Sequence, residues 1–116
     1  MPQQGDIVLI PVPFTDLSSS KRRPVIVISC DAYNDATDDM IVVAMTSNPA
    51  PALYSFTITS SDLALGSRNR PGTVRVDKIY TLSQSLMVAT FGRVNDMTLD
   101  RIGQLLHEVI ARPEAK

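Results

Sequence analysis

The sequence of 116 residues has little of several residue types on which particular protein classes depend. It contains one cysteine, Cys30, so no disulfide can form within the chain, which argues against a secreted fold held by disulfides. There is no tryptophan and one histidine, His107. These residues and the scattered aspartates match no metal-ligand spacing. We therefore expect neither a metal nor any other cofactor.

Long hydrophobic runs and an excess of positive charge are also missing. The apolar stretch Ile7–Ile10 is interrupted by Pro11 and Pro13 and follows no basic segment, so it is too short for a signal peptide or a membrane span. We expect a cytoplasmic protein with no membrane partner. Eleven basic and twelve acidic residues give a net charge of -1, so nucleic-acid binding can depend only on local clusters of charge.

The sequence has the composition of a folded protein and an alternating pattern of strands and turns. Hydrophobic residues make up 44% and charged residues 20%, and the length suits one domain over residues 1–116. Short β-branched runs separated by turn-forming residues predict strands. The predicted strands cover residues 7–12, 25–29, 40–45, 55–59, 73–76 and 88–94, and the predicted loops cover 13–21, 31–38, 48–51 and 66–72.

The last part of the chain changes to helical spacing. Leu99, Ile102, Leu105 and Leu106 recur every three or four residues, with Thr98 as the expected N-cap. The sequence therefore predicts a mainly β fold, a small antiparallel barrel or sheet, with one C-terminal helix.

One predicted strand is apolar at every position. In Ile41–Met45 both faces must be covered, one of them by the interior of the barrel. The C-terminal helix or a second subunit could cover the other face, and the sequence leaves both possibilities open.

Charged residues are segregated along the chain. Residues 31–39 carry four aspartates and no base. Three consecutive bases precede the second predicted strand, and residues 66–78 contain four bases and one acid. The bases are Lys21, Arg22 and Arg23 in the first cluster and Arg68, Arg70, Arg75 and Lys78 in the second.

Four residues at predicted strand ends have the chemistry of an RNA-cleaving site. In Val74–Asp77 the strand period places Arg75 and Asp77 on one face, roughly 7 Å apart. Alone they would be an ordinary surface ion pair, worth well under about 1 kcal/mol. However, Arg23 begins another strand, and Thr46 ends a third. If these ends converge, they supply two guanidiniums, a carboxylate and a hydroxyl.

That set is sufficient for cleavage of RNA, because the 2′-hydroxyl of the substrate is the nucleophile. Asp77 is the candidate base. Arg75 and Arg23 would bind phosphate oxygens, and Thr46 would hydrogen-bond the phosphate. His107 belongs to the helical segment, so we place it outside this site.

The same residues carry a resemblance to the MazF/PemK family of toxin endoribonucleases. It extends from Gly5 to the terminal helix, and its features occur in the family's order: Gly5-Asp6-Ile7-Val8, the arginine-proline strand Lys21–Ser29, Val42–Ser47 and Val74–Asp77. The resemblance implies an SH3-like barrel and a homodimer. It also implies sequence-specific, metal-independent cleavage of single-stranded mRNA to 2′,3′-cyclic phosphate and 5′-hydroxyl ends. A cognate antitoxin with an acidic C-terminal segment would inhibit it.

By this resemblance, the catalytic or phosphate-binding roles fall on Arg23, Thr46, Arg75 and Asp77. The RNA-binding residues would be Lys21, Arg22, Ser47, Arg68, Arg70 and Lys78. Some members of the family have a histidine in the loop after the first strand, but residues 14–22 contain none, so that residue's role does not transfer.

Two other interpretations remain open. A CcdB-type toxin that poisons gyrase has a similar barrel, but it depends on a C-terminal tryptophan, and this chain has no tryptophan. A non-catalytic SH3-like module would bind RNA or an acidic peptide through the same basic residues without cutting.

Overall fold

A computed structural model of the chain describes residues 1–11, 22–47, 52–68 and 71–113. The strands are β1 (Asp6–Pro11), β2 (Arg22–Val27), β3 (Asp39–Thr46), β4 (Ser55–Ile58), β5 (Leu63–Leu65), β6 (Gly72–Ser83) and β7 (Ala89–Val94). The helices are α1 (Asp31–Ala36) and α2 (Asp96–Ile110), with short 3-10 helices η1 (Ser60–Asp62) and η2 (Gln84–Leu86). In this part of the chain, no helix has the length and apolar character needed to cross a membrane.

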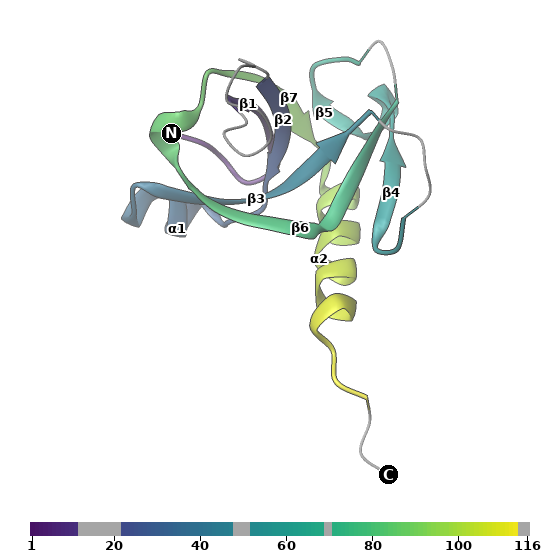
Figure 1. Cartoon of the computed structure of the whole chain (residues 1–116). Coiled ribbons are helices and arrows are strands. Elements are labelled where there is room, and N and C mark those ends of the chain that lie inside the picture. Colours follow the sequence, from purple (N-terminus) through teal and green to yellow (C-terminus); the bar gives the residue numbers. More distant parts are fainter. Residues whose placement is uncertain (12–21, 48–51, 69–70, 114–116) are drawn as a thin grey trace.

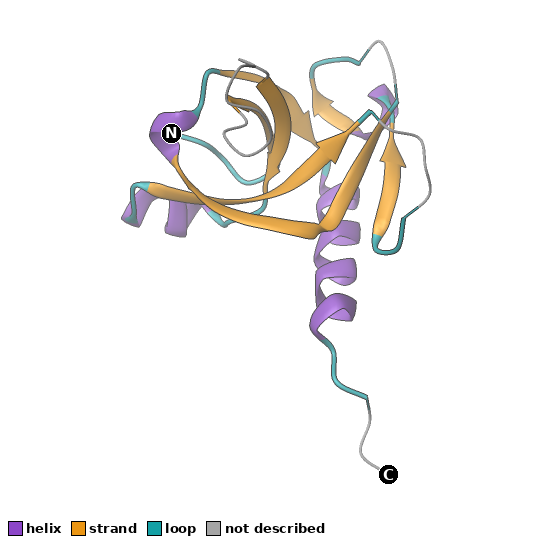
Figure 2. Ribbon diagram, viewed as in Figure 1, coloured by secondary structure: helices purple, strands orange, loops and turns teal. Residues whose placement is uncertain are grey.

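The strands form one antiparallel sheet in the order β4-β6-β3-β2-β1-β7-β5. The sheet curls into a half-barrel, and α2 extends from beneath it toward the C-terminus (Figures 1 and 2). The predicted mainly β fold with a C-terminal helix is confirmed.

Three local predictions need correction. The expected loop at 31–38 contains α1, a helix of six residues held by tertiary contacts rather than by length. The strand β5 was not predicted, because three residues are too few to show alternation. The N-cap of α2 is Asn95 rather than Thr98: the Asn95 side-chain oxygen accepts a hydrogen bond from the backbone N–H of Thr98 at 2.9 Å.

The two faces of the central strands belong to two hydrophobic clusters. On β3, Val43 and Met45 pack in the cluster that includes Ile102 of α2, whereas Met40 and Val42 pack in the cluster inside the curl of the sheet. The chain thus buries both faces of this strand by itself, and the helix contributes to one of them. The burial of β3 does not require a second subunit.

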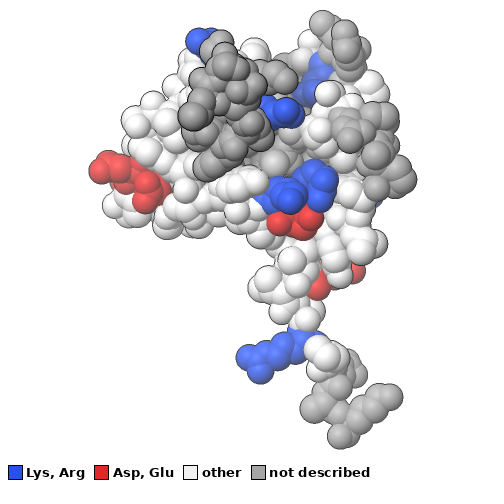
Figure 3. Space-filling model, in the orientation of Figure 1, with Lys and Arg blue, Asp and Glu red and all other residues white. Residues whose placement is uncertain are grey.

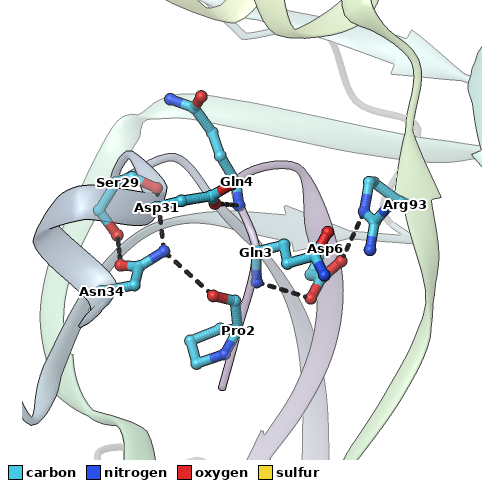
Figure 4. Close-up of polar contacts among 8 residues, drawn as sticks. All are labelled: Pro2, Gln3, Gln4, Asp6, Ser29, Asp31, Asn34 and Arg93. Carbon is cyan, nitrogen blue, oxygen red and sulfur yellow. Dashed lines mark hydrogen bonds and ion pairs between the residues drawn. The ribbon is translucent and has the colours of Figure 1, made fainter.

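A network of polar contacts fastens the N-terminal segment to α1 and β7 (Figure 4). At its centre is Asn34, whose side chain is fully buried. Its amide nitrogen donates to the carbonyl oxygens of Ser29 (3.1 Å) and Pro2 (3.3 Å), and its amide oxygen accepts from the Ser29 hydroxyl. Nearby, the buried carboxylate of Asp6 accepts from Arg93 at 2.9 Å.

We expect Asn34→Ala to lower the free energy of unfolding by about 1–3 kcal/mol, because the variant leaves buried groups of Pro2 and Ser29 without this partner. Urea denaturation followed by circular dichroism measures the change. Asp35→Ala, an exposed position on the same helix, is the matched control and should stay within about 0.5 kcal/mol of the unmodified protein. Equal stability of the two variants would contradict the structural role of the network.

Candidate active site

The candidate site begins where β2 and β3 separate. Their paired residues end at Val25 and Ala44, although β2 extends back to Arg22 and β3 continues to Thr46. Pro24 lies at this point, and proline has no N–H to donate to a neighbouring strand. The sequence Arg23-Pro24 therefore ends the hydrogen bonding between β2 and β3. It also places the cation of Arg23 where the two strands separate.

An open cleft of about 230 Å³ lies at the separation. It is lined by Arg22, Arg23, Pro24, Met45, Thr46, Ser47 and Arg68. Five residues predicted to act on RNA therefore line one cleft: three arginines and two hydroxyl side chains. Such a set of cations and hydroxyl donors suits a phosphodiester.

Arg75 shares a face of the sheet with this cleft. Ala44 pairs with Val25 on one side and with Arg75 on the other, and residues paired directly across a sheet project to the same face. By alternation along the strands, Arg23 and Thr46 project to that face too. Residues from β2, β3 and β6 thus meet on one surface, as the predicted convergence of strand ends requires.

A bulge in β6 shapes this surface. Val43 pairs with Ile79 and Ala44 with Arg75, so residues 76–78 of β6 have no partner on β3. Figure 1 shows β6 bending sharply near its middle. In a regular strand, Arg75 and Tyr80 would project to opposite faces of the sheet. The three extra residues 76–78 reverse this relation, so that both side chains project to the same face.

Arg75 and Asp77 form a bidentate ion pair. The Arg75 Nε and Nη2 atoms donate to the two Asp77 carboxylate oxygens at 3.0 and 2.8 Å, which confirms that the two side chains lie side by side. The hydrogen bond holds the pKa of Asp77 below its ordinary value and raises the pKa of Arg75. The side chains are 28% and 31% exposed, so the pair contributes at most about 1 kcal/mol. A phosphate group can therefore compete with Asp77 for Arg75.

Positive charge gathers around this pair. In Figure 3, Lys and Arg side chains cluster over β3 and the bend of β6, with acidic atoms directly beneath them. Lys78 is exposed within the bulge, and its charge also lowers the pKa of Asp77. The neighbouring charges thus favour an anionic ligand and an ionised carboxylate.

Two residues that the sequence did not indicate position Arg68. The Ser60 hydroxyl accepts a hydrogen bond from the backbone N–H of Arg68 at 2.7 Å and donates to its carbonyl oxygen at 3.0 Å. A methyl group on Gly72 would lie 2.8 Å from Arg68 Nη2. Gly72 therefore leaves the space that the guanidinium occupies.

We expect Gly72→Ala to displace the Arg68 side chain and weaken RNA binding several-fold, to the level of Arg68→Ala. The unfolding free energy should change by only about 0.5 kcal/mol, because the atoms in conflict are the ends of flexible side chains. Gly103→Ala, where nothing lies within 4 Å, is the matched glycine control. Fluorescence anisotropy with an uncleavable 2′-O-methyl RNA measures binding. Unchanged affinity in Gly72→Ala together with a loss in Arg68→Ala would show that Gly72 does not position Arg68.

The remaining candidates are placed as follows. Lys21 and Arg70 lie outside the described residues. His107 is exposed near the end of α2 and does not line the cleft, in agreement with its predicted exclusion. In the described segments, no group of three or more histidine, cysteine or acidic residues has the arrangement of a metal site.

The half-barrel sheet thus carries, at its strand ends, an arginine-lined cleft whose chemistry suits a phosphodiester. A family comparison gives the class a name: the model for PemK-like, MazF-like toxins of type II toxin-antitoxin systems matches residues 3–110. The chain belongs to this family of ribonuclease toxins, and the family and enzyme class predicted from sequence are confirmed. A comparison with curated proteins gives no significant match.

Solved structures show the same fold. A mycobacterial endoribonuclease in complex with its cognate antitoxin is 21% identical with a TM-score of 0.77, and the match covers 97% of this chain and 100% of that one. A second mycobacterial endoribonuclease is 23% identical with a TM-score of 0.74, covering 98% and 95%. The MazE-MazF complex of Deinococcus radiodurans is 21% identical with a TM-score of 0.72, covering 97% of each chain.

Proposed function

We propose that this toxin is a metal-independent, sequence-specific endoribonuclease that cleaves single-stranded mRNA in the cytoplasm. The observation that carries the proposal is the meeting of Arg23, Thr46 and the Arg75–Asp77 pair on one face of the sheet. This set holds a phosphodiester and provides a base, while the RNA supplies the nucleophile.

In the proposed reaction, the 2′-oxygen attacks the adjacent phosphorus as Asp77 takes its proton. The bond from phosphorus to the 5′-oxygen breaks, which leaves a 2′,3′-cyclic phosphate and, after protonation, a 5′-hydroxyl. Arg23 and Arg75 stabilise the charge that develops on the phosphate oxygens, and Thr46 donates a hydrogen bond to them. Arginine is a poor acid because its pKa exceeds about 12, so electrostatic stabilisation is its role here.

The ion pair gives Asp77 a way to become a stronger base when substrate binds. In the free protein, the hydrogen bond from Arg75 holds the Asp77 pKa low. A bound phosphate attracts the Arg75 guanidinium, and the weakened hydrogen bond lets the pKa of Asp77 rise toward its ordinary value. RNA binding thus prepares the carboxylate to accept the 2′-hydroxyl proton.

The test is incubation of the purified protein with a long single-stranded RNA in excess EDTA, followed by sequencing of the new 5′ ends. Discrete cuts with 5′-hydroxyl ends are the expected result, and they would reveal the recognised sequence. Asp77→Asn controls for contaminating ribonuclease. Intact RNA after incubation with the folded protein would overturn the proposal and favour a non-catalytic binding module.

The proposed inhibitor is a cognate antitoxin whose acidic C-terminal segment binds across Lys21, Arg22, Arg23 and Arg75. The mycobacterial neighbour of the same fold, an endoribonuclease in complex with its cognate antitoxin, supports this partner. Calorimetry with an acidic peptide should show affinity that falls as salt rises and that drops at least about tenfold in Arg23→Ala/Arg75→Ala. Arg112→Ala, an exposed position beyond α2, is the control. Undiminished binding to the double variant would place the peptide elsewhere.

We further propose a homodimer. Large apolar side chains remain exposed on the described surface, among them Ile79 on β6, Phe91 on β7 and Val88 between η2 and β7. A dimer interface would remove these apolar side chains from water. Light scattering at several protein concentrations measures the mass, and a monomer at all of them would exclude the dimer.

A further inference from the structure

A second, smaller pocket adjoins the arginine-lined cleft and has a different chemistry. It has a volume of about 100 Å³, and its wall is formed mainly by apolar side chains: Ile10, Val25, Ala44, Tyr80 and Leu82. Arg23 lines both this pocket and the cleft. A ligand that binds Arg23 through an anionic group can therefore place an apolar part in the smaller pocket.

Tyr80 connects the pocket to the other catalytic cation. Its side chain is 39% exposed and lines the pocket. The bulge at residues 76–78 brings Tyr80 to the face that carries Arg75. The apolar pocket is thus lined by Arg23 and, through Ala44, lies next to the strand position of Arg75.

We propose that this pocket binds one pyrimidine base of the RNA, next to the scissile phosphate, with Tyr80 as its stacking partner. The inference rests on the proposed ribonuclease function and adds a specificity-determining residue to it. Planar bases stack on aromatic side chains, and the phosphate attached to a base in the pocket lies within reach of Arg23 and Arg75.

The size of the pocket selects the kind of base. An enclosed cavity of roughly 150 Å³ accepts one benzene ring. This pocket is smaller, about 100 Å³, but opens to solvent, so a single pyrimidine ring buries most of its atoms there, whereas a purine leaves its second ring outside. The site therefore discriminates by shape, and it does so at one position of the RNA.

Photocrosslinking tests the contact without requiring cleavage. The probe is an uncleavable 2′-O-methyl oligonucleotide that carries 5-iodouridine, and the crosslinked residue is identified by mass spectrometry. We expect crosslinking at Tyr80, retained in Tyr80→Phe and lost in Tyr80→Ala. Tyr33→Ala, which removes a half-buried aromatic of α1 that does not line the pocket, should crosslink like the unmodified protein. Crosslinks only at other aromatic residues, or none, would overturn the proposal.

Cleavage-site sequencing supplies a second readout. The unmodified protein should cut only where a pyrimidine occupies one position adjacent to the cut. Tyr80→Ala should lose this preference and about 5- to 100-fold in kcat/KM, whereas Tyr80→Phe keeps both. On a substrate with an abasic residue at that position, the unmodified protein and Tyr80→Ala should be equal. Cuts without a pyrimidine preference would overturn this inference but leave the endoribonuclease proposal standing, and absence of cuts would overturn the latter.

Discussion

Asp77→Asn is expected to lower kcat for RNA cleavage by about 100-fold or more, while the Kd for an uncleavable RNA stays within about threefold. The asparagine keeps the size of the side chain and one oxygen toward Arg75, but it cannot accept the 2′-hydroxyl proton. Rapid-quench kinetics on a short RNA, together with anisotropy for binding, separates the two effects. Asp35→Asn, an exposed aspartate on α1, controls for the change of net charge. Cleavage by Asp77→Asn at the unmodified rate would exclude Asp77 as the base.

The pH dependence tests the same assignment. Because Arg75 holds the pKa of Asp77 low, the carboxylate of the free protein should become protonated only below the ordinary range of about 4, and kcat/KM should fall on the acid side there. In Arg75→Ala the Asp77 pKa should rise toward its ordinary value, because the hydrogen bond that lowers it most is gone. Titration of the Asp77 carboxyl carbon by NMR measures this pKa in both proteins. An unchanged value would show that Arg75 does not control the protonation of Asp77.

The pH dependence of stability has a defined sign. The folded-state pKa of Asp77 lies below its unfolded value, so the ion pair stabilises the fold above the unfolded pKa. This contribution is lost as pH falls through the folded pKa. Since both side chains are about one-third exposed, solvent screening keeps the contribution small, and the acid limb of activity is the more sensitive measure.

The sequence was sufficient to place Arg23 at a strand end and Arg75 beside Asp77, because the signals for these positions are local. The alternation Val74–Asp77 places Arg75 beside Asp77, and Arg23-Pro24 predicts a cation where a ladder of hydrogen bonds must stop. Both signals depend on neighbouring residues. In the structure, Arg75 and Asp77 form the expected ion pair, and Arg23 lines the cleft.

The role of Tyr80 could not be predicted in this way. Counted from Arg75 with a period of two, Tyr80 belongs to the opposite face. The three extra residues of β6 reverse that relation, and a bulge is visible only once β3 and β6 are in register. Ser60 and Gly72 were missed for a similar reason, since each acts on Arg68 across a loop rather than along a strand. Long-range register therefore limits what a single sequence reveals about this site.

Arg75→Ala is expected to reduce kcat/KM by about 100- to 1000-fold, because the variant loses a hydrogen-bond donor to the charge that develops on the phosphate oxygens. Arg75→Lys should remain at least about tenfold below the unmodified protein, since a lysine keeps the charge but not the two-pronged geometry that now binds Asp77. Arg112→Ala is the control for a lost cation. A fully active Arg75→Lys would mean that charge alone, rather than bidentate geometry, is required.

The coupling between Arg75 and Asp77 decides whether the two residues act as one unit. If phosphate binding moves Arg75 away from Asp77 and thereby prepares the base, each residue needs the other. Asp77→Asn should then cost much less in the Arg75→Ala background than in the unmodified protein. Single-turnover rates for the four proteins of this cycle give the interaction directly. If the two losses multiply, Asp77 and Arg75 contribute independently, and the ion pair of the free protein has no part in preparing the base.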